Sequence, residues 1–235
     1  EIILSGKSTA MEIDKSVGTN PVTFTNGKIK VMSNDVIVYN LLNLNTALNI
    51  SNFATSINNQ VGTGITITSG GAQYNKWKLA AIDGGTINID AAISKTDIAG
   101  TSGDYFFKKF LGQRLKLNIN ENVTANLTTE EADADYNGQV VGIEANSSKK
   151  ATSNAETQVK IATGKIIEAA RTDGTDKGAT GVFINYGQLE NKGTISVEKD
   201  TVANSGAVGV YAVNGSKVNN EGTIEAGGNE SVGIL

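Results

Sequence analysis

The sequence contains no cysteine and no histidine among its 235 residues. Without cysteine, no disulfide framework can form. Without either residue type, the Ser-His-Asp and Cys-His catalytic arrangements and a histidine-ligated zinc site cannot be built. Most hydrolase mechanisms are thereby excluded, and we do not expect an enzyme.

Long apolar runs and clusters of positive charge are also missing. No stretch approaches the ~20 apolar residues of a membrane span. The first residues, Glu1 to Leu4, lack the charged and long apolar regions of a signal peptide, so the chain is expected to be mature or a fragment. The 20 basic residues are scattered and the net charge is -4, so nucleic acid is not an expected partner.

Glycine is abundant and proline is rare, with 27 glycines and one proline. Together with many Asn and Thr residues, this composition predicts β-turns rather than helices, because Gly and Asn tolerate a positive φ. Hydrophobic residues make up 39% of the chain but aromatic residues only 6%. The core of an all-β protein is therefore expected to be built from Ile, Val, Leu and Ala.

A unit of 24 to 29 residues repeats in the C-terminal third of the chain. Residues 181–184 (GVFI) recur as 209–212 (GVYA) and as 233–235 (GIL), and residues 191–195 (NKGTI) recur as 220–224 (NEGTI). A fixed period of this length indicates stacked units that share one core.

Each unit contains two apolar alternations separated by Asn/Gly turns. Val208, Val210 and Ala212 alternate on one predicted strand face, and alternation indicates strands. Such strands cannot bury their apolar face alone, but stacking at a spacing of ~4.8 Å builds a continuous core and pairs the backbone groups. The pattern predicts a β-solenoid. The predicted register buries Val182, Ile195, Val210 and Ile224 and turns Phe183 and Tyr211 outward.

The period is interrupted in the middle of the chain. Gly-x-Ile begins at residues 27 and 85, which are 58 residues apart, but next at residue 164, a gap of 79. We therefore expect one β-helical segment over 1–235 with insertions around 100–114 and 128–158. Residues 104–112, with Asp104 as N-cap, Phe106 and Phe110 four apart and a terminal Gly112, predict a short helix. Residues 128–138 and 146–158 predict loops.

The paired pattern at 181–197 and 209–225 resembles the passenger repeats of the large type V autotransporter adhesins of fusobacteria. The resemblance is good over residues 178–235, fair over 60–92 and weak elsewhere. It implies a right-handed parallel β-helix displayed on the outer membrane, which attaches to receptors on host cells or partner bacteria. The chain would then be a fragment of a longer protein, anchored through a C-terminal barrel that lies outside this sequence.

Two other functions remain open at this point. A β-helical polysaccharide lyase or glycosidase needs carboxylates on one strand face, but Asp83, Asp90 and Asp97 are seven residues apart and form no pair on one strand. A purely structural stalk would be a regular solenoid without insertions. The insertions favour adhesion through exposed loops.

The sharpest motif is a calcium-loop pattern at residues 133–144 (DADYNGQVVGIE). Asp133, Asp135, Asn137 and Glu144 occupy the oxygen-ligand positions of the D-x-D-x-N-G-x₅-E loop. Against a calcium site, an EF-hand needs flanking helices, and residues 141–145 also align with the strand at 180–184, which turns Glu144 outward and Val141 inward. The alternative is an acidic surface loop without a cation.

Asparagine and aromatic residues suggest further roles. Asn191 and Asn220 are predicted at stacked turns, where Asn tolerates left-handed geometry and its amide can bond to the next unit. Phe183 and Tyr211 are predicted to stack as an aromatic ladder, with a small sugar-binding face as the alternative. Phe106, Phe107 and Phe110 are expected to be buried by the short helix, with a receptor-contacting knob as the alternative.

Calcium binding at residues 133–144 is directly testable. If these side chains coordinate the cation, calcium at a hundred times its dissociation constant should add about 2.7 kcal/mol to the stability of the unit that unfolds with the loop. Asp133→Ala should abolish the shift, and magnesium should substitute poorly. The calcium assignment is wrong if calorimetry detects no binding at millimolar calcium.

Overall fold

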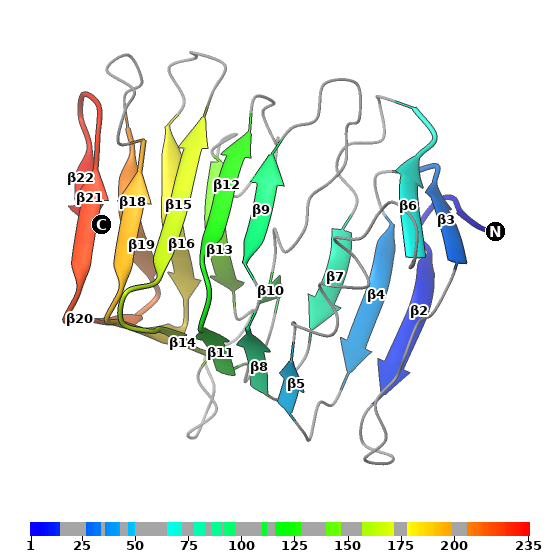
Figure 1. Ribbon diagram of the computed structural model, residues 1–235, viewed down its shortest axis with the longest axis horizontal. Coiled ribbons are helices and arrows are strands. Elements are labelled where there is room, and N and C mark those ends of the chain that lie inside the picture. The colour runs from blue at the N-terminus through cyan, green and yellow to red at the C-terminus, as the bar shows by residue number, and fades with distance from the viewer. Residues whose placement is uncertain are drawn as a thin grey trace.

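The computed structural model describes residues 1–14, 27–33, 36–42, 47–49, 65–71, 78–82, 86–90, 92–96, 110–111, 116–127, 140–146, 157–171, 178–198 and 206–235. Every regular element among these residues is a β-strand, as the sequence predicts. The strands stack along the long axis of the molecule, and the two termini lie at opposite ends (Figure 1).

Three parallel sheets make up the C-terminal part, and each takes one strand in turn from the chain. The first contains β10 (Phe110–Leu111), β13 (Val140–Asn146), β16 (Ala179–Asn185), β19 (Val208–Val213) and β22 (Val232–Ile234). The second contains β5 (Ala47–Asn49), β8 (Thr86–Ile89), β11 (Lys116–Ile119), β14 (Thr157–Ile161), β17 (Gly187–Asn191) and β20 (Lys217–Asn220). The third contains β9 (Ile93–Thr96), β12 (Val123–Leu127), β15 (Ile166–Arg171), β18 (Thr194–Val197) and β21 (Thr223–Ala226).

Two three-stranded parallel sheets form the N-terminal part (Figure 1). One contains β1 (Ile2–Leu4), β3 (Gly27–Val31) and β6 (Ile65–Ser69). The other contains β2 (Thr9–Asp14), β4 (Ile37–Leu42) and β7 (Lys78–Ile82). The second of these continues toward the C-terminal part, because β7 lies against β10.

Three consecutive strands, one in each C-terminal sheet, form a unit that we call a rung. β13, β14 and β15 make one rung, β16, β17 and β18 the next, and β19, β20 and β21 the one after. Each strand pairs in parallel with its equivalent in the next rung, as Val182 pairs with Val210 and Ile195 with Ile224. The repeated unit of the sequence is therefore one rung.

The core is a set of apolar columns between the sheets. Val182, Ile195 and Val210 are completely buried, at 0% exposure, and Ile224 in the last complete rung is partly buried against the same core. The predicted burial of the first three is confirmed. Alternation explains it, because every second side chain of a strand points to the same face and the parallel register carries that choice from rung to rung.

Glycine occupies one position of the first sheet in successive rungs, at Gly142, Gly181, Gly209 and Gly233. An added Cβ at Gly181 would lie 2.4 Å from Cγ2 of Ile195 and 2.7 Å from the backbone oxygen of Gly209. A Cβ at Gly209 would meet Cγ2 of Ile224 at 2.3 Å. The opposite sheet approaches so closely here that no side chain fits, which explains why glycine opens the repeated motif.

The facing of side chains shifts across this glycine, and one predicted register is wrong as a result. Val140, Ile143 and Ala145 join the main core, whereas Val141 packs in a separate cluster with Phe183. The prediction that Val141 faces the core assumed that side chains alternate strictly between inward and outward along residues 141–145. Val141 pairs with Thr180, and Thr180 pairs with Val208 in the next rung. Val208 likewise lies outside the main core cluster of the described residues.

Two predicted element boundaries are also wrong. Phe110 and Leu111 form β10 rather than the end of a helix, because they pair with residues 145 and 146 of β13. Both ends of the predicted loop 146–158 belong to strands: residue 146 ends β13, and residues 157 and 158 begin β14, where Thr157 is completely buried. Residues 147–156 lie outside the described residues. The other residues of the predicted helix, 104–109 and 112, and the predicted loop 128–138 lie outside the described residues.

The glycine column predicts that Gly181→Ala is destabilising. The added methyl group would force Ile195 or the neighbouring backbone to move, at a cost of about 1–3 kcal/mol. Gly233→Ala is the matched control, because an added Cβ at Gly233 meets nothing within 4 Å. Urea unfolding measures both, and equal midpoints for the two variants would contradict the steric explanation.

Candidate functional site

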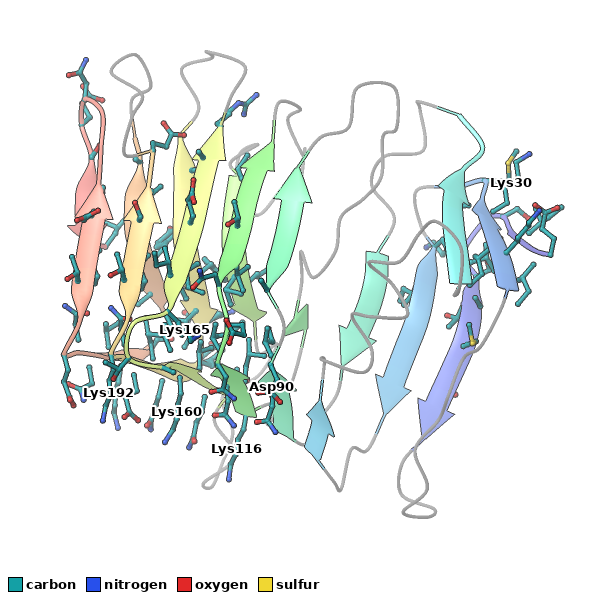
Figure 2. The ribbon with its side chains drawn as sticks, viewed as in Figure 1. Lys30, Asp90, Lys116, Lys160, Lys165 and Lys192 are labelled. Atoms are coloured by element: carbon teal, nitrogen blue, oxygen red, sulfur yellow. The ribbon has the colours of Figure 1, made fainter. Side chains whose placement is uncertain are left out.

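The outward face of the six-stranded sheet is lined by polar and charged side chains. Leu117, Val159 and Leu189 point into the core, with exposed fractions of 0%, 0% and 1%. Their neighbours along each strand face the opposite way. Figure 2 shows Lys116 and Lys160 projecting away from the sheet on this side.

Two outward rows run along the stack and together form what we call the polar face. The first row is Lys116, Gln158, Gln188 and Lys217, and the second is Asn118, Lys160, Glu190 and Asn219. Successive members of a row lie one strand spacing apart, about 4.8 Å. The face therefore repeats hydrogen-bonding groups at a fixed interval.

Over β14, β17 and β20 the polar face is hollowed into a trough of about 370 Å³. The polar side chains that line this polar trough are Gln158, Lys160, Gln188, Glu190, Lys217 and Asn219. The volume lies within the range of small-molecule sites. The six side chains comprise three amides, two ammonium groups and one carboxylate. The trough therefore offers mostly hydrogen-bond donors, together with the acceptor oxygens of the amides.

Glu190 pairs with two lysines, Lys160 of the preceding rung and Lys192, which follows its own strand β17. Its Oε2 lies 3.2 Å from Nζ of Lys160, and its Oε1 lies 3.1 Å from Nζ of Lys192. Lys192 also reaches Oε2 of Glu221 at 3.7 Å. The hydrogen bond from Lys192 is the largest cause, and that from Lys160 the second, of a lowered pKa at the Glu190 carboxyl group. The carboxylate therefore stays charged and occupied, which does not suit a general acid.

Asparagine side chains link successive rungs along the same sheet. Nδ2 of Asn118 donates to Oδ1 of Asn88 at 2.8 Å, and Nδ2 of Asn191 donates to Oδ1 of Asn220 at 2.7 Å. An amide can donate to one neighbour and accept from another, so it suits a stacked position. The predicted bond between Asn191 and Asn220 is confirmed. The two residues end strands β17 and β20 rather than lying in turns, and neither has the expected left-handed backbone, which occurs among the described non-glycine residues at Tyr186, Glu198, Asn214 and Glu230.

Phe183 and Tyr211 contact each other at the first sheet as predicted, but edge to face rather than as stacked rings. The rings of Phe183 and Tyr211 are 5.4 Å apart and nearly perpendicular, at 84°. They form a small cluster with Val141 and Val213 outside the main core. Phe183 points away from the core as predicted, but it is only 7% exposed. Phe183 is therefore packed, whereas Tyr211 and Val213 are only partly buried.

The predicted calcium ligands are described only in part. Asp133, Asp135 and Asn137 lie outside the described residues. Glu144 lies within β13, pairs in register with Phe183, and is 1% exposed. No group of three or more potential metal ligands occurs among the residues that the structure describes. Calcium binding stays a prediction. If Glu144 is a ligand, the cation has to reach its buried carboxylate.

Two other groups of predicted residues, the three aspartates and the three phenylalanines, lie mostly outside the described residues. Asp90 is exposed and accepts a hydrogen bond from Nδ2 of Asn120 at 2.8 Å, whereas Asp83 and Asp97 lie outside the described residues. Phe106 and Phe107 also lie outside them, and Phe110 belongs to β10. Whether these carboxylates lie together is therefore not tested by the described residues.

Sequence reasoning missed the polar face, although a signal was present. Lys160, Glu190 and Asn219 follow one another at intervals of 30 and 29 residues, close to the repeat period. Aligning the second strand of each unit, and not only the Gly-Val and Gly-Thr-Ile motifs, would have placed these residues in one row.

Comparison with protein-family models, with curated proteins and with solved structures finds no match to this chain. In the described part of the chain, no helix has the length and apolar character needed to cross a membrane. The resemblance to autotransporter passengers stays a prediction.

The lowered pKa of Glu190 gives a prediction for Lys192→Met. Loss of the main hydrogen-bonding partner should raise the pKa of Glu190 toward the usual glutamate range, while Lys160 keeps it below that range. Because folding lowers this pKa, the small stabilisation by the carboxylate is present at neutral pH and is lost as pH falls through the lowered value. Carbon-detected NMR titration measures the shift.

The control is Lys165→Met, because Lys165 pairs with Glu121 at 3.0 Å rather than with Glu190. A pKa for Glu190 that is the same in wild type and Lys192→Met would show that the ion pairs are not maintained in solution.

Proposed function

We propose that the chain is a right-handed parallel β-helical segment of a cell-surface adhesin. The single observation that carries this proposal is the rung: three consecutive strands enter three parallel sheets in turn, and each rung repeats the register of the last. Winding a chain in this way gives a long, regular surface on which contact residues recur. Right-handed winding follows the usual hand of connections between parallel strands.

The composition of the surface favours binding over catalysis. The one carboxylate in the polar trough is held by Lys160 and, from outside the trough, by Lys192. The sequence contains no histidine or cysteine to act as a neutral-pH base or nucleophile. A row of amide and ammonium donors instead suits recognition by hydrogen bonds.

The proposed setting is the outer face of the outer membrane, with a receptor on a host cell or a partner bacterium. The support is the resemblance of residues 178–235 to autotransporter passengers, together with the correspondence between that repeat and one rung. No cofactor is needed for this function, and calcium at residues 133–144 would act only as a structural ligand.

Attachment of beads coated with the full chain tests the proposal. We expect saturable attachment to epithelial cells or to co-aggregating bacteria, and competition by excess free chain. Val210→Asp is the control, because an unpaired carboxylate in a completely buried position should unfold the neighbouring rungs and abolish attachment.

Two results would contradict adhesion. Beads that attach no better than the Val210→Asp control would favour the purely structural stalk. Release of new reducing ends from a polysaccharide by the chain would favour the lyase or glycosidase.

A further inference from the structure

The charge of the six-stranded sheet is opposite in sign to that of the whole chain. Its six strands contain three lysines, Lys116, Lys160 and Lys217, and one glutamate, Glu190, which give a net charge of +2, whereas the chain carries -4. Lys116 and Lys217 form no ion pair with any residue that the structure describes. A positive face on an acidic protein is complementary to an anionic ligand.

The kinds of side chain on the polar face favour a glycan over a protein. The two outward rows contain lysines, amides and a glutamate but no aromatic or large apolar side chain. Protein interfaces depend on buried aromatic and arginine anchors, which are missing from these rows. Amides and ammonium groups hydrogen-bond well to hydroxyl and carboxylate groups.

The repeat of the face favours a ligand that is itself a linear polymer. Gln158, Gln188 and Lys217 occupy the same position in three successive rungs, as do Lys160, Glu190 and Asn219. A chain of sugars that lies along the stacking axis would meet a new pair of hydrogen-bonding side chains at each strand spacing of about 4.8 Å.

We propose that the polar trough over β14, β17 and β20 binds a linear acidic polysaccharide that lies along the stacking axis. Lys217 and Lys160 contact its carboxylate or sulfate groups, and Gln158 and Gln188 bond to its hydroxyl groups. This assignment deepens the adhesin function and rests on it, because it names the receptor class and the surface that recognises it.

Binding of defined oligosaccharides to the full chain tests the assignment. Hyaluronan oligosaccharides supply carboxylates, dextran sulfate oligosaccharides supply sulfates, and unmodified dextran is the neutral control. Calorimetry should detect at least one acidic oligosaccharide and no dextran, and the affinity should fall as salt rises. Lys160→Gln/Lys217→Gln should weaken binding about tenfold or more, and Gln188→Ala should weaken it without changing the charge.

Lys30→Gln is the matched charge control, because Lys30 lies near the opposite end of the molecule (Figure 2). Thermal melting checks that each variant is folded. Lys160→Gln breaks the ion pair with Glu190. If melting shows that this disturbs the fold, Lys217→Gln alone is used instead of the double variant. The assignment is overturned if neither acidic oligosaccharide binds, if dextran binds equally, or if Lys30→Gln weakens binding as much as the double variant.

Bead attachment separates this assignment from the proposed function. Attachment that is unchanged by Lys160→Gln/Lys217→Gln leaves the adhesin intact and overturns the trough assignment. Attachment that is lost after protease treatment of the cells, but not after removal of their glycans, overturns it in favour of a protein receptor. A chain that binds neither cells nor oligosaccharides overturns both proposals.

Discussion

In-register pairing of parallel strands between successive rungs is the interaction on which the rest of the structure depends. Because each strand pairs with its equivalent one rung away, every side chain has its counterpart as a neighbour at about 4.8 Å. Inside the stack, this rule builds columns of Val, Ile and Leu. At the edge of the core, it lets the amide of Asn191 bond to that of Asn220. The same rule would place like charges together, and alternation of Lys160 with Glu190 avoids that repulsion.

The thin core follows from the same constraint. A rung of three short strands encloses little space, so side chains from opposite sheets meet directly, as Ile195 meets the backbone of Gly181. Glycine is required where the sheets approach most closely, and in the described residues the rings of Phe183 and Tyr211 pack against each other outside the main core. The main core cluster of the described residues contains no aromatic side chain, in agreement with the low aromatic content of the sequence.

The repeat predicted the strands, the buried columns and the Asn191–Asn220 contact, because parallel pairing turns sequence periodicity directly into spatial proximity. It failed where one residue changes the facing of a strand. Val141 precedes a glycine that shifts the alternation, and a strict period of two cannot represent that shift. Phe110 has helical spacing to Phe106, but pairing with β13 decides its conformation. The polar face was missed because its residues, Lys160 and Glu190 among them, differ in type from rung to rung, so no motif repeats there.

Recognition along such a surface would depend on rung order, since the polar trough exists only if β14, β17 and β20 are successive neighbours. The cysteine-free sequence allows this order to be measured by disulfide formation between introduced pairs. Gln188→Cys/Lys217→Cys joins adjacent strands, within the ~4.4–6.8 Å Cα separation that a disulfide allows. Gln158→Cys/Lys217→Cys skips one strand, at about 10 Å. The stacked arrangement predicts rapid oxidation of the first pair and none of the second under mild oxidant, as read by mass spectrometry. Equal oxidation of both pairs, or of neither, would contradict it.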